Sequence, residues 1–269
     1  MVDTKANFGA GSIPEYYDRI MGPAQLERAA AELVRRLPAD PPGDLLEVAC
    51  GSGIVTRQMR KKLPAGVRIV ATDLNQPMVD YARSKLPTGV EWRQADAMAL
   101  PFADGSFGAV VCALGIMFVP DKQKAFREAR RVLRRGGLYL FNAWDTLEHN
   151  AHPRTSHAVL RELFPNDPEM NFVAPYTFND ESLIRRMLTE AGFSKIELEK
   201  SKTPVECPSA HEFATGVIRG TPRVALLEQR GASIDDVIDR FAAAFARLGG
   251  DKPFRTEVQA IIVQARVSP

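Results

Sequence analysis

The chain has 269 residues, of which 45% are hydrophobic and 25% are charged. This length suits one large α/β domain or two small ones, and the composition argues against a wholly disordered, collagen-like or disulfide-stapled chain. The 35 lysines and arginines nearly balance the 33 acidic residues, which gives a formal net charge of +2 and predicts no strong attraction to nucleic acid or to a membrane surface. Basic pairs such as Arg134-Arg135 fall on predicted helices, where we interpret them as part of a solvated face.

The three cysteines predict no metal or redox centre. Cys50, Cys112 and Cys207 are far apart and form no CxxC pair, so a zinc ribbon or a dithiol centre is not indicated. The first 25 residues lack a basic start followed by an apolar stretch, and the longest apolar run, residues 108–119, is too short to cross a bilayer. We therefore expect a cytoplasmic protein without membrane insertion.

Helices and strands alternate from about residue 24 to residue 142. Apolar residues at helical spacing predict a first helix that ends at the prolines after Leu37. Asn75 is expected to open a later helix, and Asp121 is expected to cap another, which the glycine pair 136–137 then stops. Five strands are predicted, at residues 45–49, 68–73, 90–94, 109–114 and 138–142, and the first of these is a short, mostly apolar run. This order predicts a parallel sheet with helices on both faces.

The second half of the chain is less regular. Residues 143–178 contain four prolines and three histidines, and a short helix is predicted near 156–164. Asn179 is the expected cap of the next helix. A further helix contains Ile234 and Phe245, and the two remaining strands are predicted at residues 195–200 and 258–267.

A glycine turn and two acidic residues indicate a nucleotide-type site. Gly51-Ser-Gly53 follows the first strand and opens a helix, an arrangement in which backbone N–H groups approach a ligand closely. Asp73 ends the second strand, 20 residues after Gly53, where a carboxylate can accept both hydroxyls of a ribose. Asp96 follows the third strand. The turn has Thr56 where a dinucleotide fingerprint has a third glycine or alanine.

The ordered set resembles the class I S-adenosylmethionine-dependent methyltransferases, especially their ubiquinone/menaquinone-biosynthesis-like branch, methyltransferase type 11. The matching segments are Leu46-Glu-Val-Ala-Cys-Gly-Ser-Gly53, Ala71-Thr-Asp73, Asp96-Ala-Met-Ala-Leu-Pro-Phe102, Asp104-Gly-Ser-Phe107 and Glu128-Ala-Arg-Arg-Val-Leu-Arg-Arg-Gly-Gly137. The chain departs from the family pattern at Glu47, where aspartate is common, and at Ala49, where glycine is usual. Gly108 and Arg135 are further departures. None of these changes removes a group that the chemistry requires.

The resemblance implies a Rossmann-like, doubly wound α/β fold with a mostly parallel seven-stranded sheet and an inserted, mainly helical lid. It implies one domain over residues 1–269, with a cofactor-binding core at about 24–142. The lid segments would be about 143–178 and 203–255, and residues 1–23 would form an N-terminal cover. The implied cofactor is S-adenosyl-L-methionine, with S-adenosyl-L-homocysteine as its product.

The resemblance also implies which residues hold the cofactor. Glu47, Ala49, Cys50, Gly51 and Gly53 would surround its amino-acid end, with Leu114 beside the methionyl group. Asp73 would accept the ribose hydroxyls, with Leu74 and Met78 packed nearby, and Asp96 and Ala97 would meet the adenine. Tyr17, or its neighbour Tyr16, would close over the sulfonium, whose charge favours an aromatic face.

The acceptor is not named by these motifs. Methyl transfer from a sulfonium needs mainly alignment and exclusion of water, so a dedicated base is required only for a poor nucleophile. Candidate catalytic residues are His149, His152 and His211, because histidine titrates near neutral pH. Trp144, His157, Tyr176 and Phe213 are further lid residues. No metal is predicted. We expect a small, partly apolar methyl acceptor, no nucleic-acid partner, and a homodimer as one option.

Two alternatives stay open at this stage. A nicotinamide-dependent oxidoreductase could use the same sheet, although the turn lacks its third small residue. A non-catalytic module that binds S-adenosylmethionine or S-adenosylhomocysteine would also fit the irregular second half.

Overall fold

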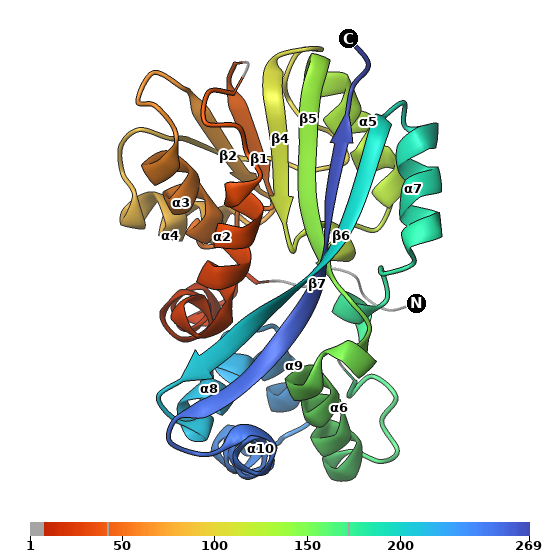
Figure 1. Cartoon of the computed structure of the whole chain (residues 1–269). Coiled ribbons are helices and arrows are strands. Elements are labelled where there is room, and N and C mark those ends of the chain that lie inside the picture. The colour runs from red at the N-terminus through yellow and green to blue at the C-terminus, as the bar shows by residue number, and fades with distance from the viewer. Residues whose placement is uncertain (1–7, 42, 172) are drawn as a thin grey trace.

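A seven-stranded sheet lies at the centre of the computed structural model, which describes residues 8–41, 43–171 and 173–269. Its strand order is β3-β2-β1-β4-β5-β7-β6 (Figure 1). The strands are β1 (Leu45–Val48), β2 (Ile69–Asp73), β3 (Glu91–Gln94), β4 (Phe107–Ala113), β5 (Leu133–Trp144), β6 (Ser194–Cys207) and β7 (Phe254–Arg266). Strands β1 to β5 pair in parallel, and β7 is antiparallel to both of its neighbours. The predicted mostly parallel, seven-stranded α/β sheet is confirmed.

Helices flank the sheet in two groups. Helix α2 (Glu27–Arg35) packs on α3 (Ile54–Lys62), with α4 (Gln76–Lys85) nearby, and α5 (Lys122–Val132) packs on α7 (Glu181–Glu190) (Figure 1). Every residue of β1 and β2 is buried, because helices cover both faces of these parallel strands. The strand order reverses at β1, so the carboxyl ends of β1 and β4 form the crevice where ligands bind in such sheets.

The N-terminal helical segment is longer than the sequence pattern predicts. It runs without a break through α1 (Ile13–Tyr16), the π-helix η1 (Tyr17–Leu26) and α2, so the expected start near residue 24 is wrong. Pro23 lies inside η1, and the wider π-turn accommodates it because its missing N–H removes a normal helical hydrogen bond. Of the predicted N-terminal cover, residues 1–7 lie outside the described residues.

A long antiparallel ribbon extends beyond the parallel strands. Strand β6 pairs with β7 along its length, whereas β7 pairs with β5 only over residues 260–266. The free half of this ribbon lies among four helices at the lower end of Figure 1, which we call the helical group. They are α6 (Ala151–Leu163), α8 (Ala210–Arg219), α9 (Arg223–Gln229) and α10 (Ile234–Gly249). Helix α8 packs on both α10 and η1, so the N-terminal segment joins the sheet to this helical group.

Several predicted boundaries are wrong. Helix α5 ends at Val132, since Leu133 is already extended (φ −80°, ψ 134°), so the pair 136–137 does not stop a helix and lies in β5 with Arg134-Arg135. Asp180, rather than Asn179, caps α7 by accepting hydrogen bonds from two backbone N–H groups. Asn75 occupies the cap position of α4, but its side-chain amide donates to Asp73. Among the described residues, no helix has both the length and the apolar character needed to cross a membrane.

Candidate active site

The turn after β1 brings backbone N–H groups toward the end of β2. The Gly51 N–H donates to Asp73 Oδ2 at 2.9 Å. Gly51 has φ +53°, and a Cβ there would meet no atom within 4 Å, so the turn leaves open space on this side. A Cβ on Gly53 would lie 3.0 Å from Ala82 Cβ, so this glycine lets the turn pack closely on α4.

Asp73 presents a nearly buried carboxylate at the carboxyl end of β2. Its exposed fraction is 7%, and burial raises its pKa against the opposing effect of its hydrogen bonds. Besides Gly51, the Asn75 backbone N–H and side-chain amide donate to it, at 2.9 and 3.3 Å. These bonds hold the carboxylate in one orientation, and a carboxylate has about four acceptor positions, so it can still accept from a ligand.

A cavity of about 420 Å³, including the space at its mouth, opens beside the turn, and we call it the cofactor cavity. Glu47 lines it with 1% exposure, and Thr56 Oγ1 donates to Glu47 Oε2 at 2.5 Å. Burial raises the pKa of Glu47 to about 8. The lining residues are Tyr17, Leu26, Ala30, Glu47, Ala49, Cys50, Gly51, Ser52, Ile54, Val55, Ala113, Leu114 and Asn142.

Two non-glycine residues that line this cavity have left-handed backbones. Ala49 has φ +56° and Leu114 has φ +52°. The side-chain oxygen of Asn142 accepts a hydrogen bond from the Leu114 N–H at 2.8 Å, which fixes the turn after β4. Ala49 is the departure from a usual glycine, and its positive φ gives the physical reason for that preference.

The other sequence-predicted cofactor residues line neither this cavity nor the next; they are Gly53, Asp73, Leu74, Met78, Asp96 and Ala97. Leu74 is 57% exposed after β2, and Met78 is buried in α4. Asp96 Oδ1 accepts a hydrogen bond from the Met98 N–H after β3, and Ala97 is half-buried. They lie at the same edge of the sheet as Asp73, because the carboxyl ends of parallel strands share one edge.

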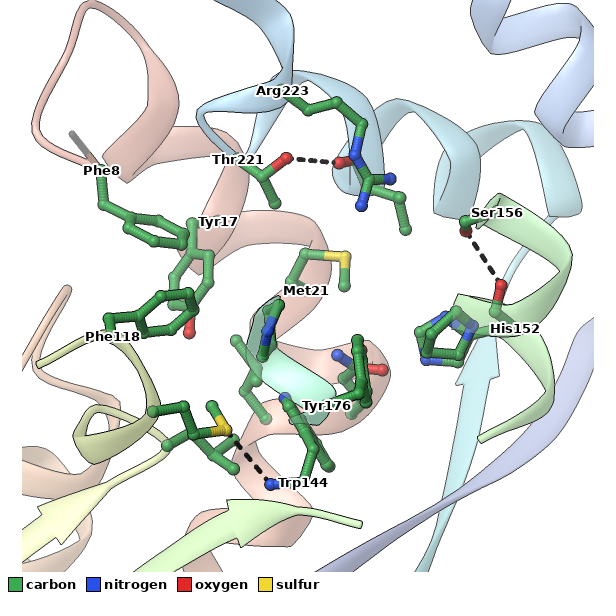
Figure 2. A pocket seen from close by; sticks show the side chains of 17 residues that line it. Phe8, Tyr17, Met21, Phe118, Trp144, His152, Ser156, Tyr176, Thr221 and Arg223 are labelled. Carbon is green, nitrogen blue, oxygen red and sulfur yellow. Dashed lines mark hydrogen bonds between the residues drawn. The ribbon is translucent and has the colours of Figure 1, made fainter. Parts of the chain in front are cut away.

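A second cavity of about 620 Å³, including the space at its mouth, adjoins the first, and we call it the acceptor cavity. It is mainly apolar and lies between η1, the ends of β4 and β5, and the helical group (Figure 2). The lining residues are Phe8, Tyr17, Met21, Gln25, Leu26, Leu114, Met117, Phe118, Trp144, His152, Pro153, Ser156, Pro175, Tyr176, Val217, Thr221 and Arg223. Tyr17, Leu26 and Leu114 line both cavities.

The candidate histidines separate by location. His152 lines the acceptor cavity and is 4% exposed, and burial followed by the charge of Arg223 lowers its pKa to about 3. His149 and His211 are exposed and line neither cavity; their ring nitrogens lie 3.5 Å from Asp145 and Asp239. Trp144 and Tyr176 line the cavity as a stacked pair, whereas His157 and Phe213 do not line it. Among the described residues, no group of three or more His, Cys, Asp or Glu side chains is placed to hold a metal ion.

The N-terminal segment is fastened to the glycine turn by Asp18. Its Oδ1 accepts hydrogen bonds from Arg57 at 2.6 Å and from Ser52 at 3.1 Å, and its Oδ2 accepts one from Tyr81 at 3.4 Å. Burial, followed by the charges of Asp73 and Asp18, raises the pKa of Tyr17, so this phenol stays protonated.

Sequence reasoning missed several residues of the acceptor cavity. Gln25 carries a detectable signal, since it precedes Ala29 and Leu33 by one and two helical repeats and is therefore a polar residue on the apolar stripe. Arg223 carries no such signal, because only the packing of α9 turns it inward. It is 5% exposed, and its pKa is lowered to about 10 by burial.

The chain is similar in sequence to known methyltransferases. Residues 46–141 match the family described as a methyltransferase domain. The ubiquinone/menaquinone biosynthesis C-methyltransferase of an Enterobacter species is 29% identical over 173 residues, covering 57% of this chain and 67% of the relative. Together these matches support a class I S-adenosylmethionine-dependent methyltransferase of the ubiquinone/menaquinone-biosynthesis-like type.

Solved structures agree with the fold of this methyltransferase. Phosphoethanolamine N-methyltransferase 2 of Haemonchus contortus, in complex with S-adenosyl-L-methionine, aligns with a TM-score of 0.60 and 17% identity. That alignment covers 95% of this chain and 57% of the other. The YcgJ protein of Bacillus subtilis aligns with a TM-score of 0.57 and 18% identity, covering 90% and 98% of the two chains.

The residues present fit the cofactor, S-adenosylmethionine. The open space at Gly51, the oriented carboxylate of Asp73 and the buried Glu47 lie at one edge of the sheet. They offer polar groups to both parts of the cofactor, which is an amino acid joined to a nucleoside. The family assignment disfavours both alternatives, the nicotinamide-dependent oxidoreductase and the non-catalytic module.

Proposed function

We propose that this methyltransferase acts on a small, partly apolar molecule bound in the acceptor cavity, at an oxygen, nitrogen or carbon atom. The observation that carries the proposal is the junction of the two cavities at Tyr17, Leu26 and Leu114. An acceptor seated on one side of this junction would face the methionine end of a cofactor on the other.

The chain's own residues would bind and orient the cofactor. When bound, S-adenosylmethionine would supply a methyl group on a positively charged sulfur, which an acceptor atom can attack in line as the sulfur–methyl bond breaks and S-adenosylhomocysteine leaves. Glu47, Gly51 and Asn142 would hold its amino-acid end, and Leu114 would border the methionyl chain. Asp73 would accept its ribose hydroxyls, and Asp96 would meet its adenine.

Aromatic residues at the junction would shield the reacting atoms from water. Tyr17 and Phe8 pack edge to face with ring centroids 5.9 Å apart, and Phe8 and Phe118 do so at 5.3 Å. An aromatic face beside a sulfonium is favourable for the same reason as a cation–π contact. Exclusion of water strengthens the electrostatic interactions inside the site.

The cavity lining favours an acceptor that is already a good nucleophile. None of the described residues that line the acceptor cavity is an aspartate or a glutamate. A phenol, a quinol or an amine needs less help from a base than an alcohol does. The relative from the Enterobacter species is named as a C-methyltransferase, which makes a carbon atom a further candidate for the methylated atom.

The proposal includes a domain organisation, in which the helical group covers the site of a single domain. Helices α6 and α8 to α10 would serve as the lid of a single domain, together with the N-terminal cover. A partly enclosed, apolar cavity suits a small molecule better than a nucleic-acid strand. The cysteines Cys50, Cys112 and Cys207 are free and buried, which suits a reducing cytoplasm.

Calorimetric titration tests the cofactor assignment. S-adenosylmethionine and S-adenosylhomocysteine should bind with micromolar affinity, and NAD and NADP should not. Asp73→Ala and the isosteric Asp73→Asn should each weaken binding by roughly 100-fold, because two charge-assisted hydrogen bonds are lost. Asp80→Ala, at an exposed carboxylate of α4, is the control and should bind normally.

Two results would count against the proposal. Unchanged affinity in both Asp73 variants would remove this residue from the site, and selective nicotinamide binding would overturn the cofactor assignment. If the cofactor binds as expected, mass spectrometry of reactions with phenols, quinols and amines identifies the class of acceptor that is methylated.

A further inference from the structure

Two polar side chains lie buried in the wall of the acceptor cavity. Gln25 is 5% exposed and His152 is 4% exposed, and neither lines the cofactor cavity. Among the described residues, Gln25 Oε1 and both ring nitrogens of His152 lack a hydrogen-bond partner. Buried polar atoms in folded proteins are almost always hydrogen-bonded, so two such side chains on one cavity point to a ligand that completes them.

His152 is held firmly but is not hydrogen-bonded. Its ring packs edge to face against Phe213, with centroids 5.0 Å apart, and against Phe245 at 6.3 Å. Asn150, two residues earlier, fixes the start of α6, because its side chain accepts from the Gln259 N–H and donates to backbone carbonyls of Asp145 and Thr146. The ring is therefore positioned by packing, and its nitrogens remain available to a ligand.

The position of His152 separates it from the methyl-transfer point. Figure 2 shows His152 and Ser156 across the cavity from Tyr17 and Phe118, with Met21 between the two sides. Tyr17 borders the cofactor cavity, whereas His152 does not. A ligand group that meets His152 would therefore lie at the end of the acceptor away from the reacting atom.

The hydrogen-bonding character of the two side chains defines the group they can bind. The pKa of His152, lowered to about 3, leaves the ring neutral near pH 7, with one donor and one acceptor nitrogen. Gln25 Oε1 can only accept. A hydroxyl group matches both, because it can donate one hydrogen bond and accept another.

We propose, on the basis of the proposed function, that Gln25 and His152 bind a second hydroxyl group of the acceptor, at the end opposite the methylated atom. The substrate class is then an apolar ring system with two separated polar functions, only one of which lies near the cofactor. Trp144 and Tyr176 are stacked on each other, with centroids 6.4 Å apart, and line the same cavity. They would contact the part of the ring system that lies between the two polar functions.

A pair of probes tests this proposal by calorimetry in saturating S-adenosylhomocysteine. The probes are 2,6-dihydroxynaphthalene and 2-naphthol, which share a ring system and differ by one hydroxyl. The dihydroxy probe should bind roughly 5- to 10-fold more tightly, as expected for one or two neutral hydrogen bonds. His152→Phe and Gln25→Leu should each reduce that ratio toward one. His211→Phe, at an exposed histidine, is the control and should keep it.

The unfolding midpoint of the empty protein provides an independent measurement. If the two polar side chains await a ligand, His152→Phe and Gln25→Leu should leave the midpoint unchanged or raise it, because each removes a buried polar group without a partner. A lowered midpoint in both variants would overturn the proposal, since these groups would then be satisfied within the protein.

The outcomes distinguish this proposal from the proposed function. If wild-type protein fails to bind S-adenosylhomocysteine, the cofactor assignment fails. If that binding is intact but the dihydroxy probe has no advantage, or keeps its advantage in both variants, only the role of Gln25 and His152 is overturned.

Discussion

Glu47 is a carboxylic acid that lies almost wholly out of water beside the cofactor cavity. Burial, the largest influence, raises its pKa to about 8, although its hydrogen bond from Thr56 acts in the other direction. The carboxyl group of the empty protein therefore carries a proton at pH 7. A cationic ligand group beside it would favour the ionised form.

Binding of S-adenosylhomocysteine should consequently release a proton from Glu47 between about pH 6 and pH 8. By linkage, affinity should rise with pH in this range, by up to about tenfold per pH unit. Titrations at pH 7 in buffers of different ionisation enthalpy measure the proton release directly. Glu47→Gln keeps the shape of the side chain and should abolish it. Equal proton release in the variant would show that another group titrates.

The same shift has a defined sign in the stability of the empty protein. Because the folded-state pKa lies above the value of an unfolded glutamate, the folded state binds more protons, and stability falls as pH rises toward about 8. Glu47→Gln should make this fall shallower. It should not remove the fall, because burial raises the pKa of Asp73 as well. Denaturant unfolding at several pH values measures both curves.

At the scale of elements, the turns after β1 and β4 are fitted to each other. Ala49 follows β1 with a left-handed backbone, and a Cβ on Gly115, after β4, would lie 2.4 Å from Ala49 Cβ. The methyl group of Ala49 therefore occupies space that Gly115 leaves empty. The departure from glycine at position 49 is accommodated across the crevice, at the cost of a strained φ.

A double-mutant cycle tests this fit. Gly115→Ala should destabilise the protein by about 2 kcal/mol through overpacking. Ala49→Gly should be neutral or stabilising by up to about 1 kcal/mol, because it relieves the left-handed strain. The double variant should recover most of the loss, as measured by denaturant unfolding.

Additive effects would contradict the direct contact between these turns. Gly66→Ala is the control partner for Ala49→Gly, since a Cβ there would meet no atom within 4 Å. Its effect should add to that of Ala49→Gly without coupling.

At the scale of the whole molecule, Asp18 connects three parts of the chain. It lies on η1 and accepts hydrogen bonds from Ser52 and Arg57 beside the glycine turn and from Tyr81 of α4. Asp18 and Arg57 side chains are only 12% and 23% exposed, so their ion pair is less screened than one on the surface. The N-terminal segment also packs on α8, which makes it the link between the sheet and the helical group.

Asp18→Asn should loosen this link and lower the unfolding free energy by about 1 kcal/mol. Hydrogen exchange followed by mass spectrometry should show several-fold faster exchange in residues 13–26, with little change in β1 and β4. Glu15→Gln is the matched control, because the Glu15–Arg19 pair is exposed and lies within one helical segment. Faster exchange throughout the protein would instead indicate a global loss of stability.

The sequence by itself determined the cofactor-binding half of this protein. Strands β1, β2 and β4 are mostly apolar, and the alternation of strands with helices is visible in neighbouring residues. The glycine turn and Asp73 follow from local backbone geometry and spacing. Boundaries were wrong where local signals compete, as at the glycine pair 136–137, which lies within β5 at a shift in the register of its pairing with β4.

Only the tertiary structure decided the acceptor cavity. The stretch from Gln25 through His152 to Arg223 spans more than half of the chain, and no periodicity relates these residues. The length of the β6–β7 ribbon and the packing of α8 on η1 determine that they line one space. The proposed cofactor residues lie at the ends of adjacent parallel strands, so spacing along the sequence predicts that they lie close together. The residues of the acceptor cavity come mainly from helices, and burial of apolar surface determines how these helices are placed. The hydrophobic effect is not directional, so no local sequence motif specifies their relative positions.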